Sequence, residues 1–308
     1  GRHCGAMPAV FDFDIPDMEK MMQNRRKRKR VILALLLAAV AGITGWMIWS
    51  NVSLQVSRYT VQANHLPKAF DGFTIAQISD LHNAEFGKDN EKLIGILQDE
   101  KPDIIAITGD LIDSDHTDIE AALSFVRQAT EIAPCYYVTG NHEAWSGTQY
   151  EELKAGLQAL GVFVLEDEAA VLEYHGAAVS VIGLNDPDFS ERDNALAGSI
   201  LNTKLTELHT QDRFTILLSH RPEHFGVYRD HNVGLVLSGH AHGGQFRLPL
   251  VGGVIAPDQG LFPEYDAGLY TDGDTAMIVS RGLGNSILPV RFCNRPEIVM
   301  IELINSAE

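Results

Sequence analysis

FTIAQISDLH, residues 73–82, is an apolar run that ends in an aspartate and a histidine two positions apart. The run has the length and apolar content of a β-strand, and Gly72 precedes it as a turn signal. Four later polar clusters follow apolar runs in the same way: Gly109-Asp110, Gly140-Asn141-His142-Glu143, His220 and Gly239-His240-Ala241-His242. Because sites in open α/β sheets lie beyond the carboxyl ends of strands, the five clusters are expected to meet at one site.

Around these clusters, strand-like and helix-like segments alternate along the chain. The first half reads as strands separated by helices, and the second half is richer in strands, which predicts an α/β fold with two mixed sheets flanked by helices. Strands are expected at residues 73–79, 104–108, 136–139, 162–165, 170–174, 178–183, 214–219, 233–238, 276–280 and 298–303. Helices are expected at residues 90–100, 119–132, 150–160 and 196–209.

The amino-terminal segment predicts contact with a membrane. Residues 25–30 are all arginine or lysine, and residues 31–49 form an uncharged run that contains Trp46 and Trp49. About 20 apolar residues span a bilayer as one helix, basic residues stay on the cytoplasmic side, and tryptophan favours the interface. We therefore expect a single-pass anchor in the cell membrane, with the body outside the cytoplasm. The alternative is an export signal cleaved near Ala39-Val40-Ala41, which would give a secreted protein.

These features divide the chain into four parts. Residues 1–30 are a basic cytoplasmic segment, residues 31–49 the anchor or export signal, residues 50–71 a connector with a first strand, and residues 72–308 the main domain. Residues 1–24 show no regular pattern, so we expect them to be irregular. Three cysteines are too few for a disulfide framework. Cys135 and Cys293 flank strand-like runs and are interpreted as buried apolar residues, with a single disulfide between them as the alternative.

The charge of the body argues against a nucleic-acid partner. The chain has a net charge of −17; residues 1–30 hold 8 basic and 4 acidic residues, so the remainder has 16 basic, 37 acidic and a net charge of −21. Nucleic-acid phosphates require lysine and arginine, so nuclease activity is disfavoured. A bound metal carries its own positive charge, which would still admit a small phosphate ester.

The polar clusters contain the residue types that ligate divalent transition metals. A site for two metal ions needs about seven ligands with one shared, and a carboxylate such as Asp110 can bridge two ions. Such a pair orients a phosphate ester and lowers the pKa of water, so that hydroxide forms near neutral pH. Oxygen and nitrogen ligands suit Mn, Fe and Zn. The candidate ligands are Asp80, His82, Asp110, Asn141, His220, His240 and His242.

Two further residues are candidates for catalysis. His142 directly follows the candidate ligand Asn141 and is placed to protonate a leaving oxygen or to hold a phosphoryl oxygen. Asp113 follows Asp110 by three residues and is expected to orient His142, although it could equally be a helix cap.

The pattern D-x-H, G-D, G-N-H-[D/E], H and G-H-x-H resembles that of the calcineurin-like metallophosphoesterase superfamily, over about residues 72–303. The resemblance implies a four-layer α/β sandwich. It also implies one metal held by Asp80, His82, Asp110 and His242, a second held by Asp110, Asn141, His220 and His240, and assistance by His142. Residues 79–83, 220–223, 239–245 and 280–284 are similar to those of the membrane-anchored or exported bacterial phosphodiesterases.

The resemblance leaves several functions open. The leading one is a phosphodiesterase or pyrophosphatase that acts on a small or lipid-linked phosphate ester. The alternatives are a phosphomonoesterase, a hydrolase of UDP-2,3-diacylglucosamine, and a metal-binding scaffold without activity. Arg281 and Arg291 are candidates for binding the substrate phosphate, or else for surface salt bridges.

Overall fold

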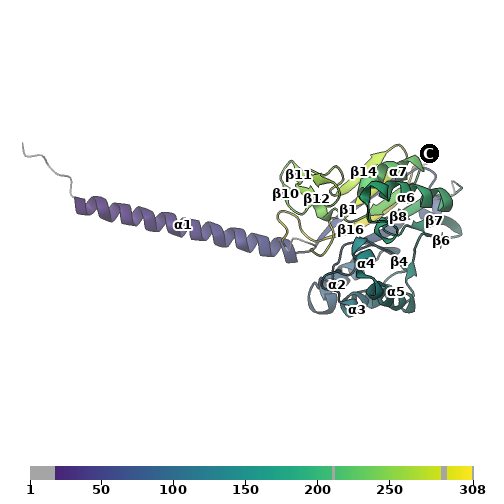
Figure 1. Cartoon of the computed structure of the whole chain (residues 1–308), viewed down its shortest axis with the longest axis horizontal. Helices are drawn as coiled ribbons and strands as arrows, with labels where there is room; N and C mark the ends of the chain where they lie inside the picture. Colours follow the sequence, from purple (N-terminus) through teal and green to yellow (C-terminus); the bar gives the residue numbers. More distant parts are fainter. Residues whose placement is uncertain (1–17, 210–211, 286–289, 307–308) are drawn as a thin grey trace, which may run out of the picture. The chain divides into compact units, whose positions relative to one another are not determined.

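Two six-stranded sheets form the centre of the body (Figure 1). The computed structural model describes residues 18–209, 212–285 and 290–306. One sheet has the strand order β1-β16-β2-β3-β4-β5, and the other has the order β14-β15-β9-β8-β7-β6. In the first sheet only the pair β16 and β2 is antiparallel. In the second, the pairs β14–β15 and β7–β6 are antiparallel, so both sheets are mixed as predicted.

The elements of these layers have the following bounds. The first sheet contains β1 (Gln55–Ala63), β2 (Thr74–Ile78), β3 (Ile104–Thr108), β4 (Cys135–Val138), β5 (Phe163–Val164) and β16 (Glu297–Asn305). The second contains β6 (Glu168–Tyr174), β7 (Ala177–Gly183), β8 (Thr215–Leu218), β9 (Leu235–Ser238), β14 (Gly268–Asp272) and β15 (Thr275–Val279). Short hairpins comprise β10 (Arg247–Leu248), β11 (Gly252–Gly253), β12 (Ile255–Ala256) and β13 (Gly260–Leu261). The helices are α1 (Met18–Val52), α2 (Glu91–Glu100), α3 (Ile119–Thr130), α4 (Asn141–Ser146), α5 (Thr148–Ala159), α6 (Asn194–Leu208) and α7 (Phe225–Asp230).

Three clusters of buried apolar side chains join four layers. One cluster lies between the two sheets and includes Phe73, Ile104 and Leu237. A second packs the first sheet against α2, α3 and α5, and the third packs the second sheet against α6 and α7. The central strands of each sheet therefore pack against helices on one face and against the other sheet on the other face. They are apolar on both faces, which explains their almost unbroken apolar sequences. The predicted four-layer α/β sandwich is confirmed.

The structure corrects several predicted boundaries. Helix α1 begins at Met18, so the basic block at residues 25–30 is helical and the expectation of an irregular segment up to residue 24 is wrong from Met18 onward. The part before Met18 lies outside the described residues. The pattern also missed α4, α7, the hairpins β10–β13 and the strand β14. The hairpin strands of two residues and the helices of six residues are too short to show a period.

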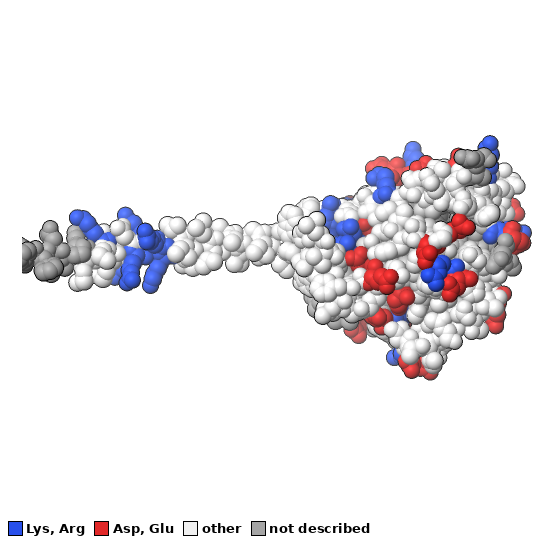
Figure 2. Space-filling model, turned by 90° about the horizontal axis from the view of Figure 1, so that it is seen from above, with Lys and Arg blue, Asp and Glu red and all other residues white. Residues whose placement is uncertain are grey.

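Helix α1 is long and apolar enough to cross a membrane by its length and composition. Figure 2 shows the blue basic block on this helix, followed by a stretch without charged residues. The compact body begins at Met47, so the last turn of α1 belongs to it, and β1 starts at Gln55 directly afterwards.

Candidate metal centre

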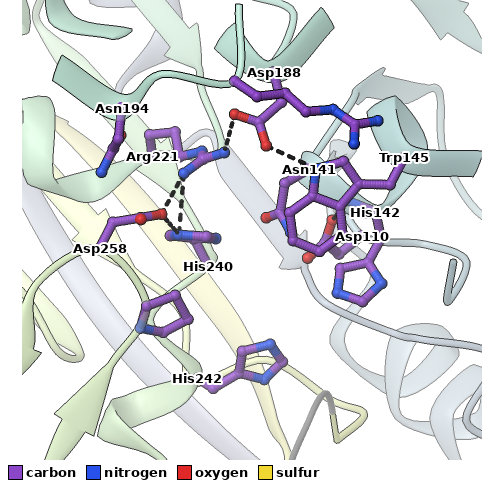
Figure 3. A pocket seen from close by; sticks show the side chains of 12 residues that line it. Asp110, Asn141, His142, Trp145, Asp188, Asn194, Arg221, His240, His242 and Asp258 are labelled. Atoms are coloured by element: carbon purple, nitrogen blue, oxygen red, sulfur yellow. Dashed lines mark hydrogen bonds and ion pairs between the residues drawn. The ribbon is translucent and has the colours of Figure 1, made fainter. Parts of the chain in front are cut away.

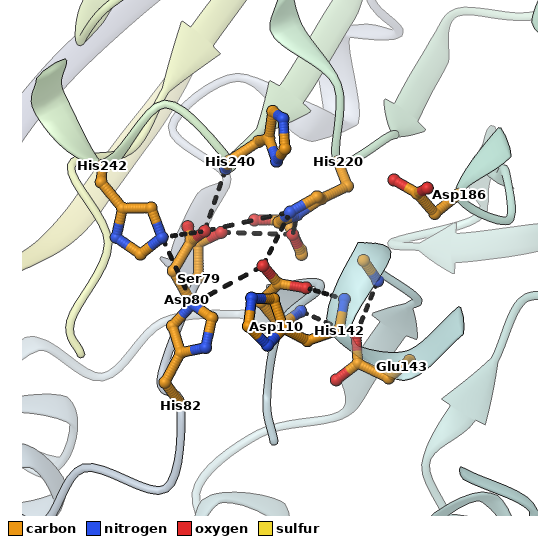
Figure 4. A network of polar contacts seen from close by, with 12 residues as sticks. Ser79, Asp80, His82, Asp110, His142, Glu143, Asp186, His220, His240 and His242 are labelled. Atoms are coloured by element: carbon orange, nitrogen blue, oxygen red, sulfur yellow. Dashed lines mark hydrogen bonds and ion pairs between the residues drawn. The ribbon is translucent and has the colours of Figure 1, made fainter. Parts of the chain in front are cut away.

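The five polar clusters lie at the carboxyl ends of five neighbouring strands in the two sheets. Asp80 and His82 follow β2, Asp110 follows β3, and Asn141 follows β4. His220 follows β8, while His240 and His242 follow β9. The central strands of both sheets are parallel, so these ends meet at one edge (Figure 4). The predicted metal ligands therefore lie together, and all seven are buried.

One group of four side chains surrounds a first point. Asp80, His82, Asp110 and His242 each offer a ligand atom within 4.8 Å of the others. The Nε2 atoms of His82 and His242 are 3.2 Å apart. Asp80 Oδ1 lies 3.4 Å from His242 Nε2, and Asp110 Oδ2 lies 3.6 Å from His82 Nε2. Two imidazole nitrogens at this distance need a shared cation or proton between them, which suits a metal ion.

A second group shares Asp110 with the first. Asp110, His220 and His240 also offer ligand atoms within 4.8 Å of one another. His220 Nε2 lies 3.2 Å from Asp110 Oδ2. The peptide oxygen of Thr108 lies 2.7 Å from His220 Nδ1, which assigns the proton to Nδ1 and leaves Nε2 as a ligand atom. The shared carboxylate is the arrangement that a bridged pair of ions requires.

Buried polar atoms without a hydrogen bond show that the residues fit metal ions. Asp80 Oδ2, Asn141 Oδ1 and His220 Nε2 are all shielded from solvent and have no hydrogen-bond partner among the described residues. An unpaired buried polar atom costs roughly 1–3 kcal/mol, so such a concentration needs an explanation. Metal coordination would satisfy all three.

Electrostatics at the site favour a positive charge. Burial alone would lower the pKa of His220, but the carboxylates of Asp110 and Asp80 raise it to about 10. Burial lowers the pKa of His242 to about 3, so its ring stays neutral and can bind a metal. A cation held between the carboxylates would take the place of the proton that His220 otherwise carries.

The backbone of the site is held in an uncommon conformation. Several candidate ligands have positive φ angles, which cost energy outside glycine and cluster at functional sites. They are Asp80 (51°), His82 (46°), Asp110 (50°), His240 (65°) and His242 (46°). Gly109 has a φ of 87°, and a Cβ there would lie 2.6 Å from His220 Nδ1, so only glycine fits before Asp110.

Glu143 holds two of the loops together. It is fully buried, and its carboxylate accepts hydrogen bonds from the peptide nitrogens of Asp110 (2.8 Å), Gly140 (2.7 Å), Leu111 (2.8 Å) and Ile112 (3.2 Å). Burial and the charge of Asp110 raise the pKa of Glu143 to about 7 against the effect of these donors. The residue therefore fixes the position of Asp110 relative to Asn141 without facing the site itself.

His142 lines the same cleft as Asp110, His240 and His242 (Figure 3). The peptide nitrogen of Ser114 donates to His142 Nδ1 over 3.1 Å, which assigns the ring proton to Nε2. Burial lowers the pKa of His142, so the ring is neutral and can donate a hydrogen bond from Nε2. The predicted orienting residue, Asp113, lies nearer to His82 Nδ1 (3.5 Å) than to His142 Nδ1 (3.8 Å). Ser114, which the sequence did not single out, makes the contacts expected of Asp113.

Arg221 and the carboxylates around it form the opposite wall of the cleft. Its guanidinium group contacts Asp186 (2.6 Å), Asp188 (3.1 Å) and Asp258, and the latter accepts from His240 Nε2 over 2.8 Å. A carboxylate that holds one ring nitrogen orients the other toward a metal. Sequence reasoning missed Asp258 and Asp188, because neither follows a predicted strand.

The two predicted substrate-binding arginines lie outside the lining of this cleft. Arg291 is fully buried, and its guanidinium group donates to the peptide oxygens of Arg281 (2.8 Å) and Gly284. Arg281 is partly buried, and its Nε lies 3.6 Å from Glu297 Oε1. Arg291 therefore stabilises the loop beside His242 instead of forming a surface salt bridge, and neither arginine faces the cleft in this structure.

Comparison with known proteins gives consistent matches. The family model described as calcineurin-like phosphoesterase matches residues 73–244. The uncharacterized metallophosphoesterase YkuE of Bacillus subtilis is 32% identical over 92% of this chain and 98% of its own length. Phosphodiesterase YaeI of Escherichia coli is 30% identical over 75% of this chain and 82% of its own. A bovine transmembrane protein with a metallophosphoesterase domain is 27% identical over 91% of this chain and 64% of its own.

Proposed function

The chain belongs to the calcineurin-like phosphoesterase family of phosphoric-ester hydrolases, and we propose that it is a phosphodiesterase that works with two divalent metal ions. One observation carries this proposal: two groups of metal-ligating side chains share Asp110 at the base of one cleft. Asp80, His82, Asp110 and His242 would hold one ion, and Asp110, Asn141, His220 and His240 the other. Bound there, Mn, Fe or Zn ions would neutralise phosphoryl oxygens and lower the pKa of water.

The chain's own residues would complete the reaction. In hydrolysis, the oxygen of water forms a bond to phosphorus, the bond from phosphorus to the leaving oxygen breaks, and that oxygen gains a proton. His142 lines the cleft, and its Nε2–H would donate to a phosphoryl or leaving oxygen. Asp113 would orient His82 through Nδ1, which adds to the coordination of the first ion.

The charge of the cleft supports a diester over a monoester. A monoester carries close to two negative charges at neutral pH, since its second pKa is near 6, whereas a diester carries one. Arg221 in the cleft wall is already surrounded by Asp186, Asp188, Glu223 and Asp258. Its charge is therefore compensated, and a dianion would gain little from it. The phosphodiesterase YaeI among the relatives agrees with this preference.

Helix α1 supports a proposal for the location of the enzyme. We propose that α1 anchors the chain in the cell membrane, with residues 25–30 in the cytoplasm and the body outside, because basic residues flank the cytoplasmic end of a spanning helix. The relative named a transmembrane protein supports an anchor.

The first test is hydrolysis of bis(p-nitrophenyl) phosphate beside p-nitrophenyl phosphate by the full-length chain in detergent. The protein is stripped of metal and then given Mn, Zn or Fe. We expect metal-dependent turnover of the diester, lost by at least 100-fold in Asp110→Asn because the shared ligand is weakened. Asp272→Asn, in an exposed ion pair with Arg229, is the control. Turnover of the monoester alone would establish a phosphomonoesterase instead.

A further inference from the structure

Exposed apolar side chains are concentrated in one loop of the body, residues 248–262. Six large apolar residues in these 15 positions are exposed to solvent: Leu248, Leu250, Val251, Ile255, Leu261 and Phe262. Leu250 and Phe262 expose 108% and 61% of their surface. Exposed apolar side chains gathered in one segment mark a contact with a membrane or another protein.

The only charged residue of this loop is directed inward. Asp258 contacts Arg221 and His240 at the wall of the cleft. Pro257 lines the same cleft. The loop therefore presents apolar side chains outward and its single charge to the proposed active site, so whatever covers the loop lies beside the cleft entrance.

The loop is continuous with the end of the proposed anchor. The side chain of Gln245 donates to the peptide oxygen of Val290 (3.0 Å), and the peptide nitrogen of Arg247 donates to the peptide oxygen of Phe292 (3.0 Å). Both donors lie just before the loop. Between Val290 and Phe292, the peptide nitrogen of Arg291 donates to Asn51 Oδ1 in the last turn of α1 (3.0 Å). Residues 290–292 thus form a short strap that joins the loop to the last turn of α1. Figure 2 shows an uncharged surface on the body around that turn.

The last turn of α1 is itself apolar and exposed. Ile48 and Val52 expose 61% and 59% of their surface, and Trp49 lies under the guanidinium group of Arg295 at 4.8 Å. Tryptophan and arginine favour the interface between lipid and water. Because β1 begins only three residues after Val52, no linker separates this turn from the body.

We propose that residues 248–262 dock on the lipid bilayer and that the substrate is a phosphodiester of a membrane lipid, whose head group enters the cleft beside Asp258. The substrate class rests on the proposed phosphodiesterase function, whereas the docking does not. Trp145, which exposes 41% of its surface, also lines the cleft. A polar cleft between apolar rims suits a molecule with a charged head and apolar chains.

The docking is tested without any reaction. The full-length chain carrying Cys4→Ser and Cys293→Ser is reconstituted in phosphatidylcholine vesicles, with a nitrobenzoxadiazole label on Leu250→Cys. The label is expected to be quenched at least twofold by lipids with spin-labelled chains. The matched control is Val171→Cys, an exposed apolar position on β6, where no such quenching is expected. The docking would be overturned if only iodide in the water quenched the label at position 250. It would also be overturned if a second copy of the chain shielded this label in lipid-free detergent.

The substrate class is tested with two diesters that share the same scissile bond. One is methyl p-nitrophenyl phosphate in solution, and the other is a diacylglycerol p-nitrophenyl phosphate in the vesicles. The variant Leu250→Ser/Val251→Ser/Phe262→Ser is expected to lose at least tenfold on the lipid and less than twofold on the soluble diester. The control variant Phe163→Ser/Val171→Ser/Leu269→Ser changes three exposed apolar residues elsewhere and should lose neither.

The outcomes separate the two ideas. Equal loss on both diesters would mean that the loop only shapes the cleft, and equal retention would mean that the lipid does not need the loop; either overturns the assignment of a lipid substrate. Absence of turnover on both diesters by the unchanged chain would overturn the phosphodiesterase function itself, while the quenching result would still decide whether the loop docks.

Discussion

His240 belongs to a metal-ligand motif, but its orientation is set by Asp258, a residue outside these motifs. Its Nε2 donates to Asp258 Oδ2 over 2.8 Å, so Nδ1 is the nitrogen left for a metal ion. Its peptide nitrogen donates to Asp80 Oδ1 over 3.0 Å, which fixes the backbone at a positive φ angle. Both ends of the residue are therefore constrained before any metal binds.

We expect Asp258→Asn to weaken metal binding about 10- to 100-fold, the usual effect of removing a carboxylate that orients a ligating histidine. Calorimetric titration of the metal-free full-length protein with Zn or Mn measures this directly, without substrate. The loss should fall on one of two binding steps, because His240 belongs to only one of the two groups. Asp272→Asn is again the matched control; unchanged affinity in Asp258→Asn would refute the orienting role.

The grouping of the candidate metal ligands could be predicted from the sequence, whereas the residues around them could not. Asp80, His82 and His242 each follow an apolar run, and strand ends in parallel sheets meet, so position along the chain implied position in space. Asp258 lies in a loop without a period, and only its isolation as a single charge among apolar residues distinguishes it. Ser114 rather than the expected Asp113 bonds to His142, because the conformation of this loop decides which residue reaches the ring. Spacing along the sequence does not determine that conformation.

Helix α4 is a short element whose function is structural. The helix begins at Asn141. The carboxylate of Glu143 in its first turn accepts hydrogen bonds from the peptide nitrogens of Gly140, directly before the helix, and of Asp110, in the loop after β3. A negative side chain in the first turn also suits the dipole of the helix. The element thus ties two ligand-bearing loops together at the base of the site.

We expect Glu143→Gln to lower the free energy of unfolding by about 2–3 kcal/mol, because an amide nitrogen would face peptide donors and leave them unpaired. Urea denaturation of the metal-free protein in detergent, followed by tryptophan fluorescence, measures the change. The control is Glu151→Gln, an exposed residue of α5, for which a change within 0.5 kcal/mol is expected. Equal stability of the two variants would show that the Glu143 contacts contribute nothing.

The predicted strands and long helices agree with the structure because each has an apolar face of sufficient length. Helix α3, for example, buries Ala122, Phe125, Val126 and Ala129 at helical spacing. The hairpins β10–β13 have no such face: Leu248 and Leu261 are exposed, so no buried pattern marks them. The most exposed apolar segment of the body was therefore the one that the sequence pattern failed to describe.

Two strands far apart in the sequence pair in one sheet of the body. Strand β1, which follows α1, pairs in parallel with β16 from Gln55–Glu297 to Ala63–Asn305. Such long-range pairing cannot be read from local periodicity, whereas the alternation of strands and helices was enough to predict two sheets between helices. The last turn of α1, which belongs to the body, is thus held by β1 directly after it and by the hydrogen bond between Arg291 and Asn51.

The native cysteines allow the proposed orientation to be tested, because Cys4 precedes α1 and Cys293 follows it. Cys135 should stay silent: it is 1% exposed, and burial raises the pKa of its thiol to about 12, so almost no thiolate forms at pH 8. Cys293 is partly exposed, so the expectation that it is buried is wrong. It is expected to react with a maleimide that cannot cross membranes when intact spheroplasts are treated. Cys4 should react only after the cells are lysed.

Cys4→Ser and Cys293→Ser assign the label to one site each, and mass spectrometry of the modified peptide confirms it. If the Cys293→Ser variant is labelled in intact spheroplasts and Cys4→Ser only after lysis, the body lies in the cytoplasm. The lipid-facing loop would then act on the inner leaflet, and residues 25–30 would lie outside against the usual distribution of basic residues. Loss of residues before about 41 from the mature protein would instead indicate a cleaved signal and a secreted enzyme, leaving no helix to hold residues 248–262 at the bilayer.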